Sequence, residues 1–166
     1  MTVRPIVRFP DRRLGAVAEP VSVFDEDLHH LATDCADTMH AAPGIGITAP
    51  HIGILKRLVV IELSREAGPR TYVNPVILWA SGDMIRRTEG SVSMPGVAEN
   101  IERHARVRVS YQGLDGIEQV EEADGLLAVC HQHEIDQLNG IFWIQKLSRL
   151  KRDRLIKRYE KLARVR

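Results

Sequence analysis

Apolar residues first recur at helical spacing in the segment that follows Asp25. From Leu28 to Met39 every third or fourth position is apolar, which is the spacing of one helix face. Aspartate commonly caps helix N-termini, and Pro43-Gly44 interrupts the pattern. The sequence therefore predicts a helix that follows Asp25 and ends at Pro43-Gly44, with Leu28, Leu31, Ala32, Cys35, Ala36 and Met39 at helical spacing.

The middle of the chain carries the patterns of β-strands. The run from Leu58 to Ile61 is typical of a buried strand, and a later segment alternates apolar and polar residues. Leu114-Asp115-Gly116 is a turn sequence that lets the next segment pair back as a hairpin. Because proline has no N–H to donate within a sheet, Asn74-Pro75 belongs at an edge or a bend. The predicted strands are Arg57–Leu63, Thr71–Ala80, Asp83–Arg87, Arg106–Tyr111 and Ile117–Glu122.

Two further helices are predicted in the last third of the chain. One runs from about Asp124 to Leu138 and ends at Asn139-Gly140, which is a typical stop signal. The other begins near Ser148 and has an apolar side. Strands in a block with helices around them indicate an α+β fold, in one domain over residues 1–166 with a C-terminal helix at 148–166. The apolar side of that last helix consists of Leu150, Ile156, Tyr159 and Leu162.

The composition is ordinary for a globular protein, with 44% hydrophobic and 27% charged residues. No apolar run approaches the roughly 20 residues that cross a bilayer, and the N-terminus lacks the apolar stretch of a secretory signal. Two cysteines are too few for a disulfide framework. We therefore expect a cytoplasmic protein without a membrane partner.

The net charge of +1 hides an uneven distribution. From Lys146 onward, ten Lys and Arg residues stand against two Asp and Glu residues, which gives this segment a charge of +8 and leaves −7 for the rest. Such a tail either binds a polyanionic partner or forms the solvated face of a helix. The sequence leaves both interpretations open and gives no indication of a DNA partner.

The helix predicted at 124–138 carries residues that could perform chemistry. Cys130, His133, Glu134 and Gln137 lie along one side of it, because residues three and four apart are neighbours on a helix. In a metallohydrolase helix of the His-Glu-x-x-His type, two histidines hold the metal and the glutamate is the general base. Here the second histidine of that pattern is replaced by Gln137.

The glycines of the loop Pro43–His51 let the backbone approach a ligand or another strand closely, although taken alone they equally predict a tight turn. Glu89–Gly96 is a second glycine-flanked loop. Together with the helix they resemble the three signature motifs of peptide deformylases, in the right order and at similar spacing. The family motifs are Gly-Φ-Gly-Φ-Ala-Ala-x-Gln, Glu-Gly-Cys-Leu-Ser and Gln-His-Glu-x-Asp-His-Leu. The corresponding segments of this chain are Gly44–His51, Glu89–Ser93 and Gln132–Leu138.

The resemblance covers essentially the whole chain and implies a peptide deformylase-like fold. It also implies metal-assisted removal of the N-formyl group from the methionine of nascent peptides. In the family, the motif cysteine and both motif histidines hold ferrous iron or a substitute such as zinc or nickel. A metal-bound water is the nucleophile, the motif glutamate moves its proton, and the motif glutamine with the backbone N–H after the cysteine stabilises the oxyanion.

Carried over residue by residue, the resemblance makes Glu134 the catalytic general base and His133 a metal ligand. Gly46 and the Val92 N–H correspond to backbone contacts with the substrate. The pocket for the methionine side chain corresponds to Ile45, Leu126, Val129 and Cys130.

Each motif departs from the family at a position that performs chemistry. Ser91 replaces the cysteine ligand, Gln137 replaces a histidine ligand, and His51 replaces the oxyanion glutamine. A bound metal readily ionises a thiol, whereas a hydroxyl and an amide carbonyl bind iron or zinc weakly as neutral oxygen donors. If the roughly 10–16 kcal/mol of a zinc site is shared among its ligands, loss of two weakens binding by about four orders of magnitude. We therefore expect the usual metal centre of the family to be lost.

Three hypotheses follow. The first is a deformylase-like protein whose hydrolytic activity is lost or strongly reduced. The second is an active formyl-peptide hydrolase with a remodelled metal site, in which His51 and His133 form a two-imidazole site completed by Glu134 or water. The third is a non-catalytic module that binds peptide or the ribosome, since 148–166 resembles the basic helix with which bacterial deformylases dock near the exit tunnel. A helix that only caps the domain remains the alternative interpretation of that segment.

Overall fold

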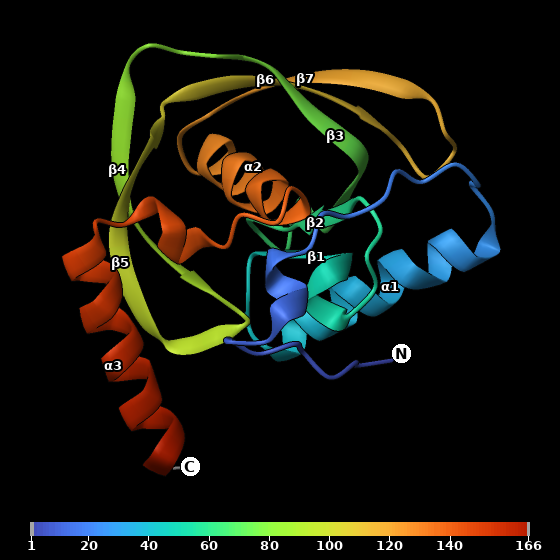
Figure 1. Cartoon of the computed structure of the whole chain (residues 1–166). Coiled ribbons are helices and arrows are strands. Elements are labelled where there is room, and N and C mark those ends of the chain that lie inside the picture. The colour runs from blue at the N-terminus through green and yellow to red at the C-terminus, as the bar shows by residue number, and fades with distance from the viewer. Residues whose placement is uncertain (1, 166) are drawn as a thin grey trace.

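The structure, a computed structural model, describes residues 2–165, which form two antiparallel sheets and three α-helices (Figure 1). The larger sheet has five strands in the order β1-β2-β3-β6-β7, and every neighbouring pair is antiparallel. The α+β class expected from the sequence is confirmed. The strands of this sheet are β1 (Gly46–Thr48), β2 (Leu58–Ile61), β3 (Arg70–Ala80), β6 (Arg106–Gln112) and β7 (Glu118–Asp124).

The smaller sheet is a hairpin of β4 (Met84–Ser91) and β5 (Met94–His104). The sequence predicted a short strand at Asp83–Arg87, which is shorter than β4, and it predicted no strand over β5. Both predictions were wrong. From Gly96 to Arg103 the exposure of β5 alternates with period two, but two of the inward positions are the charged residues Glu99 and Arg103, so the sequence lacks the usual apolar alternation. The buried residues of β5 are Met94, Val97, Ile101 and Arg103.

Helix α1 (Glu26–Ala41) begins where the sequence predicted, because the Asp25 carboxylate accepts a hydrogen bond from the Leu28 N–H at 3.1 Å. Its apolar face packs with residues of β1 and β2 in one core cluster. Part of the segment expected to be a loop is strand β1, in which Ile47 is fully buried. This edge strand leads into a short 3-10 helix, Ala49–Ile52, which carries His51.

The segment around Pro75 bends, as expected. The pairing of β3 with β6 shifts register between Val73 and Val76, and Asn74 has a positive φ of 51°. The Asn74 side chain holds the bend by bonding to both the N–H and the carbonyl oxygen of Val21. The bend therefore carries the chain past the proline without loss of the sheet.

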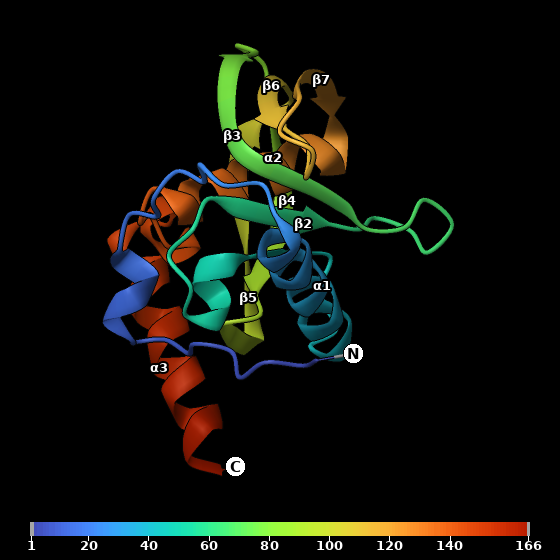
Figure 2. The ribbon, with the colours of Figure 1, turned by 90° about the vertical axis from the view of Figure 1, so that its right-hand side faces the viewer.

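Helix α2 (Gly125–Leu138) lies at the centre of the molecule, between the large sheet and the β4–β5 hairpin (Figures 1 and 2). It is buried on several sides, and its buried residues include polar ones. The buried polar side chains of α2 are His131, Gln132, Glu134 and Gln137. Burial of so many polar groups is unusual, and each must find a partner within the protein or a ligand.

Helix α3 (Arg149–Val165) packs against β5 through Leu155 and Tyr159, which are buried. The predicted apolar side was wrong at two positions, since Leu150 is 61% exposed and Leu162 is 37% exposed. Residues 155 and 159 are one turn apart on one face, so they set the contact with β5. Leu150 lies off that face. Leu162 lies on it, but at the end of α3 that extends past the β4–β5 hairpin, so it stays partly exposed (Figure 1).

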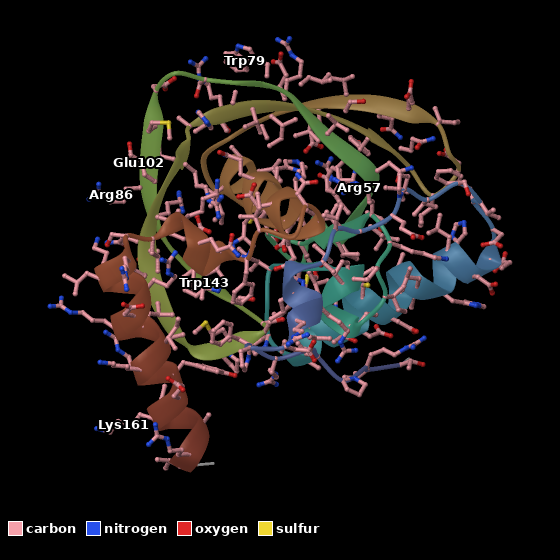
Figure 3. The ribbon with its side chains drawn as sticks, viewed as in Figure 1. Arg57, Trp79, Arg86, Glu102, Trp143 and Lys161 are labelled. Carbon is pink, nitrogen blue, oxygen red and sulfur yellow. The ribbon has the colours of Figure 1, made fainter. Side chains whose placement is uncertain are left out.

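The basic residues of α3 face away from the rest of the protein. Lys161 points outward from the helix in Figure 3, and six further basic residues of α3 are exposed. Residue 166, part of the segment predicted as a basic helix, lies outside the described residues. Across residues 2–165, no helix combines the length and apolar character needed to cross a bilayer.

Candidate functional site

A cavity of about 390 Å³ opens between the end of β1, the tip of the β4–β5 hairpin and helix α2. It brings together segments that are up to 92 positions apart in the sequence, and nearly all residues carried over from the resemblance line it. These lining residues are Ile45, Gly46, His51, Ser91, Val92, Leu126, Val129, Cys130, His133 and Glu134. Among the predicted site residues, only Gln137 is not part of the cavity wall.

The Gln137 side chain instead bonds to the N-terminal segment. Its Nε2 donates to the main-chain oxygen of Leu14 at 2.8 Å, and the residue is 2% exposed. Leu14 belongs to a short 3-10 helix, Arg12–Gly15, that packs beside the end of α2. The amide nitrogen is thereby engaged with the N-terminal segment, and Gln137 is not part of the cavity wall.

His133 is held by a buried network of charges. Its Nδ1 lies 2.8 Å from Glu89 Oε1, and Arg103 donates to both Glu89 oxygens at 2.9 Å and to Asp136 at 2.7 Å. Because a carboxylate accepts only, His133 Nδ1 carries a proton, and the lone pair of the neutral ring is on Nε2. Burial lowers the pKa of His133, but Glu134 and the contact with Glu89 outweigh burial and raise it.

The same network holds the Glu89 carboxyl in its charged form. Burial alone would raise the pKa of Glu89, but hydrogen bonds from Arg103 and His133 outweigh it and lower the pKa to about 2. Glu89 therefore remains an acceptor across the ordinary pH range. It orients the His133 ring toward the cavity.

His51 has the opposite arrangement of its ring nitrogens. The Thr48 N–H donates to His51 Nδ1 at 2.9 Å, and the Thr48 hydroxyl lies 3.0 Å from the same nitrogen. Since a backbone N–H only donates, Nδ1 is the acceptor and the proton of the neutral ring lies on Nε2. Burial, with a smaller contribution from His133, lowers the pKa of His51 to about 3. The ring is therefore neutral at physiological pH.

Glu134 lies against the glycine of β1. A side chain at Gly46 would overlap the Glu134 carboxylate, so the absence of a Cβ there makes room for it. Burial raises the pKa of Glu134, and His133 partly opposes this. Glu134 Oε1 and His51 Nε2 are both buried and have no hydrogen-bond partner among residues 2–165.

Ser91 and Cys130 complete the polar part of the cavity wall. The Ser91 hydroxyl oxygen accepts a hydrogen bond from the Ser93 N–H at 3.0 Å. Burial and the nearby carboxyls of Glu134 and Glu89 raise the pKa of the Cys130 thiol to about 12. Cys130 is therefore a neutral thiol at physiological pH in the metal-free protein.

Comparison with known proteins decides the family. The family model described as polypeptide deformylase matches residues 3–153. This chain belongs to the peptide deformylase family. The Brucella melitensis protein named peptide deformylase-like is 71% identical over 164 residues, which cover 99% of this chain and 100% of that protein.

Proteins named peptide deformylase without that qualifier are also similar to the chain. One from Methylocella silvestris is 44% identical over 171 residues, covering 99% of this chain and 87% of that protein. The crystal structure of a peptide deformylase from Legionella pneumophila matches with a TM-score of 0.94 and 38% identity, covering 99% of this chain and 97% of that one. The fold of the family is therefore retained throughout the chain.

The residues at the metal position of this peptide deformylase family member do not fit the family's metal. His133 offers one nitrogen lone pair, Ser91 offers a hydroxyl, and Gln137 is engaged with Leu14. Within the described part of the chain, no group of three or more His, Cys, Asp or Glu side chains is arranged to hold a metal ion. Iron, zinc and nickel sites are built from imidazole, thiolate or carboxylate ligands, so this donor set lacks the required chemistry.

Sequence reasoning did not find the residues that orient the two histidines. Glu89 stands in the second motif, so its place beside His133 could have been proposed from the motif alone. Arg103 and Thr48 gave no signal, because each acts through a contact that only the fold creates. His131 bonds to Glu121 at 2.8 Å, outside the cavity wall.

Proposed function

We propose that this chain is a cytoplasmic peptide deformylase family member in which metal-assisted removal of the N-formyl group is lost or strongly reduced. The cavity keeps its apolar wall for the methionine side chain of a peptide. The observation that carries the proposal is the hydrogen bond from Gln137 to Leu14, which directs the side chain at a ligand position away from the cavity.

The energetics of ligand loss support this proposal. Each ligand of a structural zinc site contributes roughly 3 kcal/mol, so a site without two of its three protein ligands binds metal about four orders of magnitude more weakly. A general base such as Glu134 contributes about 10²–10⁴-fold by itself. That is far below the acceleration of about 10⁶-fold or more that is typical of enzymes.

A remodelled site with His51 and His133 has less support. Metal binding requires a nitrogen lone pair from each ring directed at one point. The His51 lone pair is on Nδ1 and already accepts the Thr48 N–H, while Nε2 carries the proton. His51 would have to lose that backbone hydrogen bond before it could bind a metal.

Turnover of a formyl-Met peptide tests the proposal. The purified protein is assayed with added ferrous iron, zinc or nickel, beside a Glu134→Ala variant and a peptide deformylase with the intact motifs. We expect the unmodified protein and Glu134→Ala to hydrolyse the peptide at the same slow rate. Turnover comparable to that of the intact enzyme, abolished in Glu134→Ala, would contradict the proposal.

A second function, binding to the ribosome, is supported by the exposed basic surface of α3. The helix uses only one face to pack on β5, and the rest of its surface faces solvent. Contacts between lysine or arginine and phosphate give sequence-independent affinity for RNA. The exposed basic residues are Arg149, Lys151, Arg154, Lys157, Arg158, Lys161 and Arg164.

Co-sedimentation with ribosomes tests this second function through charge reversal. Changing three exposed lysines of α3 to glutamate should reduce binding by about tenfold or more, since each phosphate contact adds to affinity. A control variant reverses three exposed arginines elsewhere, which gives the same change in net charge. Equal binding by the two variants would contradict a role for α3. The α3 variant is K151E/K157E/K161E and the control is R8E/R65E/R86E.

A further inference from the structure

Ser91 lies at the tip of the β4–β5 hairpin and has a hydroxyl hydrogen without an acceptor. The residue ends β4 and pairs with Met94 of β5, so Val92 and Ser93 form the turn between the two strands. The Ser91 oxygen accepts the Ser93 N–H at 3.0 Å, but no acceptor for its own hydrogen is present among residues 2–165. Because a hydroxyl group both donates and accepts, Ser91 keeps an available donor in the cavity wall.

His133 offers the matching acceptor from α2. Its Nδ1 donates to Glu89 at 2.8 Å, so the lone pair of the neutral ring is on Nε2, which has no partner in the described part of the chain. Arg103 donates to both oxygens of Glu89 and thereby fixes the carboxylate that holds the ring. The protein thus sets the tautomer in which Nε2 accepts a proton.

Ser91, His133 and Glu89 together have the donor and acceptor order of a serine hydrolase triad. In such a triad a histidine takes the serine proton through one ring nitrogen, and a buried carboxylate on the other nitrogen fixes the tautomer. All three residues line the same cavity. No hydrogen bond joins Ser91 to His133 in the structure, so the Ser91 hydroxyl must turn from the Ser93 N–H toward the ring before it reacts.

Another residue of the cavity wall carries a donor for the charge that develops during acyl transfer. His51 is 1% exposed, and its Nε2–H has no acceptor among residues 2–165. A buried N–H without an acceptor is rare in native proteins, and such a donor stabilises an oxyanion that forms beside it. Leu126 and Val129 add an apolar wall, which fits a short hydrocarbon group.

We propose that Ser91, His133 and Glu89 form a hydrolytic centre for carboxylic esters with a short apolar acyl group. Ser91 is the nucleophile, His133 is the general base, and Glu89 is the positioning residue that sets the His133 tautomer. Esters are the expected class because an alcohol leaves more readily than an amine. The centre goes beyond the proposed function, and its steps draw only on side chains of this chain and on water.

The reaction takes place in two steps. In the first, Ser91 Oγ bonds to the ester carbonyl carbon while its proton passes to His133 Nε2. The bond from that carbon to the alcohol oxygen then breaks, and the alcohol leaves with the proton from His133. In the second step, water attacks the acyl carbon and gives a proton to His133, the bond to Ser91 Oγ breaks, and Ser91 recovers that proton as the carboxylic acid leaves.

Labelling with diisopropyl fluorophosphate tests the inference on the unmodified protein in the presence of a chelator. The reagent phosphorylates an activated serine and releases fluoride, and mass spectrometry of the peptides locates the adduct. We expect one equivalent at Ser91, formed about 100-fold or more faster than in the protein unfolded in urea. No adduct at Ser91, or labelling no faster than in the unfolded protein, would overturn the inference.

Hydrolysis of p-nitrophenyl butyrate tests the roles of the two catalytic side chains. Ser91→Ala and His133→Gln should each lower the rate about 100-fold or more, since a positioned general base contributes about 10²–10⁴-fold. The matched control is Ser93→Ala, which removes a buried hydroxyl without a partner among residues 2–165 but keeps the backbone N–H that contacts Ser91. This control should hydrolyse the ester at the unmodified rate. Equal rates of Ser91→Ala and Ser93→Ala would overturn the inference.

Nitrogen NMR of the His133 ring tests the role of Glu89 through a signal that a purely structural contact does not move. At about pH 8.5 the unmodified protein should carry the ring proton on Nδ1 and the lone pair on Nε2. Glu89→Gln offers an amide N–H to Nδ1, so it should move the proton to Nε2 and slow the labelling of Ser91 about tenfold or more. A proton on Nε2 in the unmodified protein, or unchanged labelling beside a moved proton, would overturn the inference.

Discussion

Gln137 and Leu14 are joined by a hydrogen bond from the side-chain Nε2 to the main-chain oxygen, 2.8 Å long and spanning 123 positions of the chain. This contact ties the end of α2 to the N-terminal segment. On the resemblance to the family motifs, Gln137 stands where a histidine ligand is expected, so we propose that the substitution exchanges a ligand for a structural contact.

The contact should therefore contribute to stability. We expect Gln137→Leu to lower the free energy of unfolding by about 1–3 kcal/mol, because the buried Leu14 oxygen loses its donor. Denaturant unfolding followed by circular dichroism measures this. Gln145→Leu, at an exposed position on the neighbouring 3-10 helix, is the control and should change stability by about 0.5 kcal/mol or less. Equal effects of the two changes would contradict a special role for the Gln137 contact.

Restoring the motif residues should restore metal binding. In Ser91→Cys with Gln137→His, the thiolate and second imidazole should tighten zinc or nickel binding by about four orders of magnitude over the unmodified protein. Each single change should recover about half of this on a logarithmic scale. Competition with a chromogenic chelator measures the affinities. Unchanged affinity in the double variant would show that the cavity, and not the ligands, limits binding.

The buried Arg103 is the centre of the charge network behind His133. Its side chain is 3% exposed and bonds to Glu89 and Asp136. Arg103→Met should destabilise the protein by about 3–5 kcal/mol, because the buried carboxylate of Glu89 loses its cationic partner and keeps only the hydrogen bond from His133. The matched control Arg106→Met breaks an exposed ion pair with Asp83 and should cost about 1 kcal/mol or less. Thermal unfolding measures the stability of both variants. Equal melting temperatures of Arg103→Met and Arg106→Met would contradict this account.

Neutral, buried His51 predicts a dependence of stability on pH. In the folded protein the pKa of His51 is about 3, below its ordinary value of 6.5, so between these pH values the unfolded chain binds a proton that the folded chain does not. The contribution of neutral His51 to the free energy of unfolding is therefore complete above pH 6.5, and it is lost as the pH falls toward 3. The slope is up to about 1.4 kcal/mol per pH unit.

The His51→Gln variant isolates this contribution. Glutamine does not titrate, so the variant should lose less stability than the unmodified protein between pH 6.5 and 4. Chemical unfolding at a series of pH values measures the difference between the two proteins. Parallel pH curves would mean that His51 is not held neutral in the folded state.

The sequence predicted the family, the α+β class and most residues of the cavity wall, because the three motifs kept their order and spacing. It could not predict where Gln137 bonds, since Leu14 is distant in sequence and contributes only a main-chain oxygen. It also could not assign the proton of His51, which depends on the Thr48 N–H. Strand β5 was missed because charged residues, Glu99 and Arg103, occupy inward positions of the strand, and Leu150 was misplaced because a hydrophobic residue need not face the core.

The metal content of the unmodified protein tests the central claim most directly. The protein is purified without chelator under conditions that protect ferrous iron, equilibrated with equimolar iron, nickel or zinc, and analysed by mass spectrometry of the elements after gel filtration. We predict well below one equivalent of any metal, with no change on Ser91→Ala. One full equivalent that survives gel filtration and is lost in His133→Ala would contradict the account.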